Sequence, residues 1–283
     1  MICARLVGGL GNQLHILAAG LAIASKNDAP LLLDVSLLKN EFVTAREYEL
    51  EPFINIVSQL YPIKVVNFNG VDDEYLKNLL VHHFNQGFEI WRDLEVDPQS
   101  QLKMIPNNSI IRGHFLNFTW ADLAYSAGFT KNLLSNIDAS LDSDFLPNQI
   151  NIHIRLGDFL RNRHIIPKIP SCYFHEAIAM FNLEEKVYIY TDDIKMLSLQ
   201  YPLVFLRSDR VFTPRKNDTL ASFKMLSQGK MIVTSNSTFS TWAAWFSNSK
   251  YIFTPIPHMI NVPWEDSLPE NWIRFDMKSR NWI

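Results

Sequence analysis

Hydrophobic and polar positions along the first forty residues predict a strand, a helix and a second strand. Residues 2–7 form a short apolar run, and apolar positions between Leu14 and Leu21 then recur at the i, i+3, i+4 and i+7 spacing of one helix face. A second apolar run, 31–33, ends at Asp34. Two strands separated by a helix indicate a β-α-β unit with parallel strands.

The same alternation returns after residue 150. It predicts strands at 150–159, 187–193 and 231–235 and helices near 173–181, 218–229 and 236–246. The helix 218–229 is capped by Asp218 and ended by Gly229. A further short apolar run lies at 203–206. Between 41 and 147 the pattern is weaker, with short apolar runs such as 109–112, and we assign no elements there. The charged, proline-containing stretch 142–149 predicts a linker. We therefore expect two α/β domains, 1–145 and 146–283.

Composition narrows the class of protein. The 283 residues are 47% hydrophobic and 19% charged, which fits a globular protein with a substantial core. The formal net charge is -3 and no lysine or arginine stripe is present, so we expect no nucleic-acid partner. Cys3 and Cys172 are too few for a disulfide scaffold or a clustered metal site, and they suit a reducing cytoplasm.

The chain shows no export or membrane-spanning signal. Gly8, Gly9 and Gly11 interrupt any apolar stretch near the N-terminus, so no signal peptide is expected. No window reaches the roughly 18 to 20 apolar residues of a membrane-spanning helix. We therefore expect a cytoplasmic protein whose membrane contact, if it has one, is peripheral and at the inner face of the cytoplasmic membrane.

The stretch INIHIRLGD, 150–158, places His153 and Arg155 on one strand face, because side chains alternate along a strand. Gly157 and Asp158 follow, at the end of a strand where open α/β sheets bind ligands. The planar fork of an arginine suits a phosphate. An ordinary Arg155–Asp158 ion pair on a half-exposed strand is the alternative.

A second candidate lies where strand 231–235 runs into the next helix. The backbone N–H groups at this helix start, together with the hydroxyls of Ser237 and Thr238, form a potential anion site. An ordinary Ser/Thr cap is the alternative. The buried stripe of the helix is expected at Phe239, Trp242, Ala243 and Phe246.

Thr191, Asp192 and Asp193 directly follow an apolar strand. A carboxylate there can accept hydrogen bonds from a ribose or a base, although adjacent aspartates after a strand more often cap the next helix. The pair lacks the spacing of a DxD motif, and the eight histidines show no HxH or HxxxH pairing with a carboxylate. We therefore expect no bound metal.

The segment GGLGNQ, 8–13, partly fits the dinucleotide fingerprint GxGxxG. Gly9 and Gly11 take its first two positions, but Leu14 falls on the third, where close packing of helix on strand needs a small residue. Asp34 stands where a ribose-binding acid would be, so an NAD-dependent oxidoreductase is an alternative. Asn12 and Gln13 add amide groups that suit a sugar or a phosphate.

Four motifs, in this order, resemble those of α-1,2-fucosyltransferases, glycosyltransferase family 11. The segments are GGLGNQ (8–13), HIRLGDF (153–159), TDD (191–193) and NSTFSTWAAW (236–245), and they span nearly the whole chain. The resemblance implies a GT-B-like α/β fold of two Rossmann-like domains whose parallel sheets face a cleft. Domain 1–145 is then the acceptor side and domain 146–283 binds GDP-fucose.

The resemblance also implies an inverting, metal-independent transfer of L-fucose from GDP-β-L-fucose, with no cofactor besides this donor. The acceptor would be a β-galactoside or related hexosyl unit of a lipid-linked oligosaccharide in surface-polysaccharide (O-antigen) biosynthesis. Catalysis would fall to Arg155, Asp158 and His153. The donor-binding residues would be Gly9, Gly11, Asn12, Gln13, His153, Arg155, Asp192, Asp193, Asn236, Ser237, Thr238 and Phe239.

This sequence departs from the family pattern at one position, and the resemblance leaves the general base open. Many members carry HxRRGD, whereas Leu156 replaces the second arginine here. Residue 156 should face away from the side of Arg155, so its loss need not remove the phosphate contact, but it puts in doubt any role that the second arginine has elsewhere. Our hypothesis for the general base is Asp158, with His15 and Asn12 as alternatives. A non-catalytic GDP-sugar-binding protein is a further alternative to the enzyme.

Overall fold

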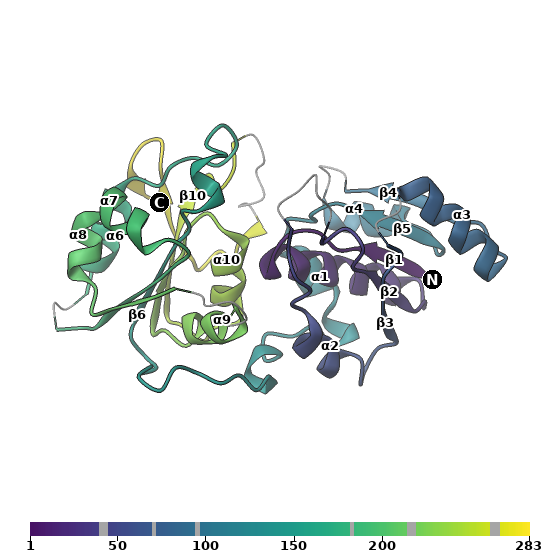
Figure 1. Cartoon of the computed structure of the whole chain (residues 1–283), viewed down its shortest axis with the longest axis horizontal. Coiled ribbons are helices and arrows are strands. Elements are labelled where there is room, and N and C mark those ends of the chain that lie inside the picture. The colour runs from purple at the N-terminus through teal and green to yellow at the C-terminus, as the bar shows by residue number, and fades with distance from the viewer. Residues whose placement is uncertain (40–44, 70–71, 94–96, 182–183, 214–218, 261–266) are drawn as a thin grey trace. The chain divides into compact units, whose positions relative to one another are not determined.

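A computed structural model of the chain describes residues 1–39, 45–69, 72–93, 97–181, 184–213, 219–260 and 267–283 (Figure 1). The chain divides into two compact units, Met1–Asp138 and Ala139–Ile283. The predicted linker, 142–149, packs with the second unit, because Asp144 and Asp142 both pair with Arg210. Each unit is described separately.

The first unit is built on a five-stranded parallel sheet with the order β3-β2-β1-β5-β4. The β-α-β unit predicted from the first forty residues is present. The strands are β1 (Ile2–Arg5), β2 (Leu31–Asp34), β3 (Ile63–Val66), β4 (Glu89–Arg92) and β5 (Ser109–Arg112). The helices are α1 (Leu10–Lys26), α2 (Glu51–Val57), α3 (Asp73–Phe84), α4 (Pro98–Met104) and α5 (Thr119–Leu123), followed by the 3-10 turns η1 (Tyr125–Ala127) and η2 (Leu134–Asn136).

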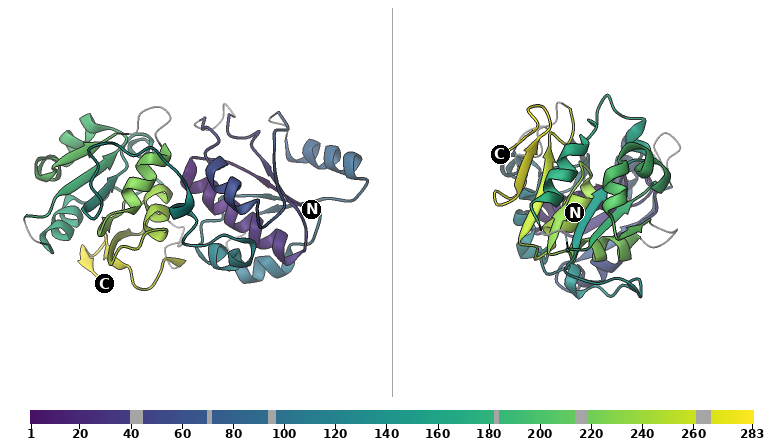
Figure 2. Two further views of the ribbon diagram at one scale, coloured as in Figure 1. Left: turned by 90° about the horizontal axis from the view of Figure 1, so that it is seen from below. Right: turned by 90° about the vertical axis from the view of Figure 1, so that its left-hand side faces the viewer.

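Helix α1 is buried on nearly every side and packs along β1 and β2 of the sheet; it is the long purple helix in the left view of Figure 2. Its close packing does not come from the fingerprint position, Leu14. A Cβ added at Gly20 would lie 3.1 Å from Leu31 and 3.3 Å from Ala4, so this glycine sets the distance between helix and sheet.

A buried ionic network joins the strand ends of the first unit. Arg5, at the end of β1, binds Asp34 through Nε at 3.0 Å and Asp73 through Nη1 at 2.7 Å. Asp73, in the first turn of α3, also pairs with Arg92 and Arg112. Since Arg5 and Asp34 are fully buried, the network must pair its charges internally.

The second unit has a seven-stranded sheet with the order β12-β11-β10-β9-β6-β7-β8, parallel except for the β11–β12 pair. The strands are β6 (Ile150–Ile154), β7 (Val187–Thr191), β8 (Arg210–Phe212), β9 (Met231–Val233), β10 (Tyr251–Ile256), β11 (Ile273–Asp276) and β12 (Asn281–Trp282). The helices are α6 (Ser171–Ala179), α7 (Ile194–Gln200), α8 (Pro202–Arg207), α9 (Thr219–Ser227) and α10 (Thr238–Trp245), with the turn η3 (Asp158–Leu160). Strands β7 and β8 lie on one side of β6 and the later strands on the other, which is the arrangement of a Rossmann fold with its switch point between β6 and β9.

Two sequence expectations change in detail, and a third lies outside the described residues. The apolar run 203–206 forms helix α8, and the next strand follows it as β8. Strand β6 ends at Ile154, so Arg155 lies in the turn after the strand and not within it. The predicted cap, Asp218, lies outside the described residues; the helix that it was expected to cap is present as α9, Thr219–Ser227.

Replacing Asp73 with alanine should destabilise the first unit strongly. The change leaves the buried Arg5 guanidinium without one of its two carboxylates, a loss that costs about 3–5 kcal/mol in buried ion pairs. Urea unfolding measures the effect. The matched control is Glu74→Ala, because Glu74 is exposed and pairs only loosely with Lys77 at 3.9 Å, so it should change stability by less than about 0.5 kcal/mol. Equal effects of the two substitutions would contradict this account.

Candidate active site

His153 and Ser235 join the two strands that flank the switch point of the second unit. His153 Nδ1 lies 2.8 Å from Ser235 Oγ, and the His153 ring packs against Phe239 with the centroids 5.3 Å apart. Burial, helped by the nearby positive charge of Arg155, lowers the pKa of His153 to about 3. The imidazole is therefore neutral at physiological pH, and it orients its neighbours without adding charge.

Arg155 is held by two carboxylates. Its Nε and Nη2 donate to Asp158 Oδ1 at 3.1 and 2.8 Å, and Nη1 lies 3.1 Å from Asp192 Oδ2. The ion pair with Asp158, which the sequence offered as the alternative to a phosphate site, thus exists in this structure. All three side chains are partly exposed, so the guanidinium is both oriented and accessible. An anionic ligand would compete with these carboxylates for the remaining N–H groups.

Asp192 reaches Arg155 because of the backbone next to it. Its Oδ1 accepts a hydrogen bond from the Leu156 amide at 2.8 Å. A Cβ at Gly157 would lie 2.5 Å from Asp192 Oδ2, so only glycine leaves room for the carboxylate. The Leu156 side chain is 3% exposed and belongs to the core cluster of the unit, as expected for a residue that points away from the arginine.

The two adjacent aspartates have different tasks. Asp193 accepts from the Met196 amide at 2.9 Å and is the N-cap of α7. Asp192 is the one that faces Arg155. A sequence cannot separate such neighbours, because both follow the same strand.

The start of helix α10 lies at the end of β9, beside His153. Ser237 is its N-cap and makes no side-chain capping hydrogen bond, while Asn236 donates its amide to the Pro167 carbonyl at 2.9 Å. Asn236 therefore fastens the loop that follows β6. Trp242, Ala243 and Phe246 form the buried stripe as predicted, whereas Phe239, which was predicted to belong to it, is partly exposed, as is Thr238.

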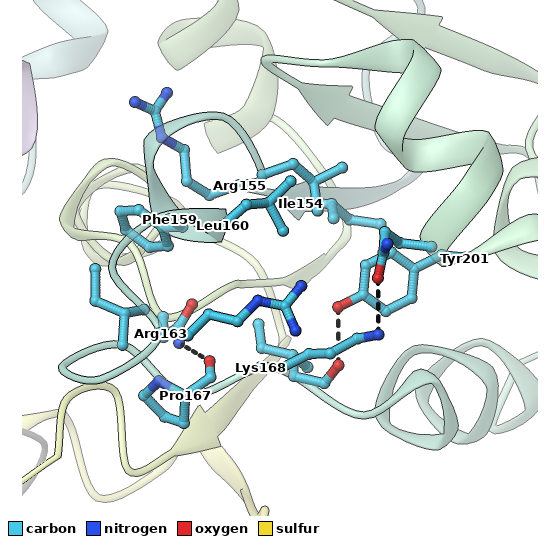
Figure 3. Close-up of a pocket in the computed structure, with 13 residues that line it drawn as sticks. Ile154, Arg155, Phe159, Leu160, Arg163, Pro167, Lys168 and Tyr201 are labelled. Carbon is cyan, nitrogen blue, oxygen red and sulfur yellow. Dashed lines mark hydrogen bonds between the residues drawn. The ribbon is translucent and has the colours of Figure 1, made fainter.

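A small cavity of about 30 Å³ opens beside this cluster (Figure 3). Two cations that the sequence analysis did not select, Arg163 and Lys168, line it together with Tyr201. Figure 3 shows the Arg163 guanidinium pointing toward Lys168 and Tyr201, whereas the Arg155 guanidinium points away from them. The cluster of basic residues between 161 and 168 is the sequence signal that could have identified these two cations. The cavity is also lined by Ile154, Arg155, Leu156, Phe159, Leu160, Ile166, Pro167, Ile169, Gln200 and Asn236.

The GGLGNQ residues lie in the first unit, at the switch point between β1 and β5. Gly9 is the N-cap of α1, and Gly11 is buried in its first turn. The Gln13 side chain is buried and bonds the Gly8 and Glu47 carbonyls at 2.9 and 2.8 Å, so it fixes the loop before α2. Asn12 Nδ2 lies 3.4 Å from His114 Nδ1, a histidine that the sequence analysis did not consider.

Two alternatives from the sequence lose support in this unit. His15, named as a possible base, is fully buried against Phe118, and burial lowers its pKa to about 3, so it cannot meet an acceptor. Asp34, the ribose acid of the oxidoreductase alternative, is fully buried and bonded to Arg5 and Ser36. Its carboxylate is committed to the ionic network.

Within the described parts of the chain, no three histidine, cysteine, aspartate or glutamate side chains are grouped as metal ligands would be. No helix among those residues is long and apolar enough to cross a bilayer.

Buried neutral histidines should make folding stability fall with acid. Burial is the main cause that lowers the pKa of His15, His153 and His258 to about 3, while their unfolded value is about 6.5. Below pH 6.5 the unfolded chain binds protons that the folded chain does not, so the free energy of unfolding should fall by about 1.4 kcal/mol per pH unit for each histidine. Urea titrations between pH 6.5 and 5 measure this slope. His153→Asn should reduce the slope by the contribution of one histidine. An unchanged slope would refute the conclusion that His153 is neutral in the folded protein.

Comparisons with known proteins agree with this architecture. A curated relative, the alpha-1,2-colitosyltransferase of Escherichia coli, is 26% identical, and the match covers 98% of this chain and 99% of that protein. The fucosyltransferase NodZ from Bradyrhizobium superposes with a TM-score of 0.52 at 14% identity, covering 100% of this chain and 97% of that one. A NodZ alpha-1,6-fucosyltransferase co-crystallised with GDP gives a TM-score of 0.50 at 15% identity, covering 89% and 93%. The likeness confirms the GT-B fold.

The family comparison settles the class of enzyme. The model of glycosyl transferase family 11 matches residues 123–283, which is more than half of the chain and includes the whole Arg155 cluster. The chain is therefore a GT-B-fold glycosyltransferase and belongs to glycosyl transferase family 11.

Proposed function

We propose that the protein is an inverting, metal-independent α-1,2-fucosyltransferase that moves L-fucose from GDP-β-L-fucose to a β-galactoside or related hexosyl acceptor. In this proposal the second unit binds the donor and the first unit binds the acceptor. The acceptor is part of a lipid-linked oligosaccharide that enters surface polysaccharide, of the O-antigen type. The enzyme acts in the cytoplasm, at the inner face of the membrane.

The observation that carries the proposal is the Arg155 cluster at the switch point between β6 and β9. Ligands of open α/β sheets bind at this place, and the cluster presents an oriented guanidinium there. A nucleotide diphosphate gains negative charge on its leaving phosphate as the sugar departs. An arginine stays charged at any working pH and offers donors to both phosphates.

The start of α10 supplements the arginine. Its first backbone N–H groups and its positive dipole end lie next to His153, and Ser237 leaves them without a side-chain cap. Ser237 and Thr238 add hydroxyl donors. Together these groups offer the leaving diphosphate the stabilisation that a divalent cation gives in other glycosyltransferases, which supports a metal-independent reaction.

Asp158 is a positioning residue in this proposal. Its carboxylate accepts from two nitrogens of Arg155 and so fixes the plane of the guanidinium. Asp192 holds the opposite end, and the Leu156 amide fixes Asp192 in turn. The arginine is thereby held in one orientation before the donor binds, which lowers the entropy lost on binding.

The proposed linkage is supported by a relative and the proposed sugar by the motif resemblance. The E. coli relative is named for an alpha-1,2 transfer, which supports the α-1,2 linkage. The motif resemblance supports fucose as the sugar. Because that relative is a colitosyltransferase, colitosyl transfer is the second candidate, and the donor assay separates the two.

The donor assay measures GDP release from GDP-fucose in the presence of EDTA, with and without a panel of β-galactosides and β-N-acetylgalactosaminides. We expect release that depends on one acceptor and is insensitive to EDTA. Release only after adding a divalent metal would contradict metal independence. Release only from a colitosyl donor would select the second candidate, and binding without any release would indicate a sugar-nucleotide-binding protein.

Arg155→Ala provides the internal check of this assay. It should slow GDP release by about 10²- to 10³-fold, the usual cost of losing one donor to a developing anion. The matched control is Arg161→Ala, an exposed arginine in the same loop, which should keep normal turnover and the same melting temperature. Near-normal turnover of the Arg155 variant would overturn the phosphate role.

Substitutions of Asp158 distinguish a positioning residue from a general base. Asp158→Asn keeps an oxygen that accepts from Arg155, so transfer should fall by about tenfold or less, whereas Asp158→Ala should lose more and bind GDP more weakly. A general base would lose about 10²- to 10⁴-fold in both variants with GDP affinity unchanged. Steady-state kinetics and GDP titration of the two variants supply both readouts.

A further inference from the structure

We propose that His114 is the general base that takes the proton of the acceptor hydroxyl, with Asn12 as the residue that orients its ring. This inference rests on the proposed function, because it assigns the proton of the same transfer. It also replaces Asp158 and His15 as the candidates for that role.

The position of the pair in the fold is the first support. In the sheet of the first unit, β1 and β5 are neighbours, with β2 and β3 on one side and β4 on the other. Asn12 lies in the first turn of α1, which follows β1, and His114 lies just after β5. The pair therefore stands at the switch point of this sheet, where a ligand of the unit is expected to bind.

The backbone around His114 is fixed on both sides. Gly113 has a φ of +153°, and a Cβ there would lie 2.1 Å from the Asp93 Cβ, so only glycine allows this approach. The Phe115 amide donates to Asp93 Oδ2 at 2.7 Å, and the Phe115 ring is buried against Trp120. Phe115 itself has a φ of +51°, a left-handed conformation that costs energy for a residue of this size and persists only where its surroundings enforce it.

Asn12 is fixed in a similar way. Gly8 has a φ of +76°, and a Cβ there would lie 2.4 Å from Asn12 Nδ2, so the glycine makes room for the amide. Between these two anchored segments His114 is exposed, in contrast to the fully buried His15. The exposed imidazole is thus the histidine of this switch point that a ligand can reach.

The chemistry of the pair suits proton transfer. A turn of the Asn12 amide lets its oxygen accept from Nδ1–H of His114, which leaves the lone pair of Nε2 to receive a proton. Partial desolvation by the surrounding protein lowers the pKa of His114, while the Asp93 carboxylate opposes this change; the nearby His15 is neutral. His114 is therefore neutral near pH 7, as a base must be.

The balanced step is as follows. The acceptor oxygen forms a bond to C1 of the sugar as the bond from C1 to the phosphate oxygen breaks, and that electron pair leaves with GDP. The acceptor proton moves to His114 Nε2 and later passes to solvent. No oxidant, reductant or metal enters the balance.

The test compares His114→Ala and His114→Gln with the wild-type enzyme, using the donor and acceptor that the wild type turns over. Both variants should lose about 10²-fold or more in kcat, and both should bind GDP as the wild type does. Added imidazole should restore part of the activity of His114→Ala alone, because the glutamine side chain fills the space. The control His82→Ala removes an exposed histidine of the same unit and should change nothing.

Retention of more than about a tenth of the rate in either His114 variant would overturn the proposal, since general-base catalysis is worth far more. Failure of imidazole to restore activity would also overturn it, because a purely structural histidine is not replaced by a free base. Neither result touches the proposed function, which fails instead if the wild-type enzyme itself releases no GDP from any donor.

Discussion

Parallel strand pairing is the constraint on which both units depend. Parallel strands need a crossover helix between them, so every strand of such a sheet ends at the same edge and every helix begins there. At the point where the strand order reverses, the helices that follow the two neighbouring strands lead away from each other, and a crevice stays open at the strand ends. In the second unit this edge collects Arg155, Ser235 and the start of α10, and in the first unit it collects Asn12 and His114. Chemistry-bearing residues from distant parts of the chain meet there without any special loop.

The patterns that follow strict periodicity were predicted correctly. Alternation around His153 and the apolar run before Thr191 both form buried strands, and the polar run before Phe239 begins a helix. These signals are strong because period-two alternation and short apolar runs both favour strands, whereas an apolar stripe at helical spacing favours a helix. The stretch 41–147, most of which lies in the first unit, gave no such signal. The outer strands of this unit, β3 and β4, are short and half-exposed, so they lack an apolar run.

The roles of single side chains were harder to predict than the elements that carry them. Asp192 and Asp193 follow the same strand, yet one holds Arg155 and the other caps α7. Gln13 stands in the motif next to Asn12, yet it is buried and pins the loop before α2. His15 is likewise buried in the core. In each case the direction of the side chain decides the role, and a one-residue difference in position changes that direction by about 100° in a helix and 180° in a strand. Motif letters do not carry this information, whereas tertiary packing does.

Gly157 links two motifs that are far apart in the sequence. Its missing side chain is the space that the Asp192 carboxylate occupies, and that carboxylate holds both the Leu156 amide and the Arg155 guanidinium. A larger residue at 157 and a shorter or longer one at 192 therefore affect the same few ångströms of space. Substitutions at the two positions are coupled, and their energetic effects should not add. We therefore expect evolution to change the RLGD and TDD segments together, because a larger residue at 157 fits only with a different residue at 192.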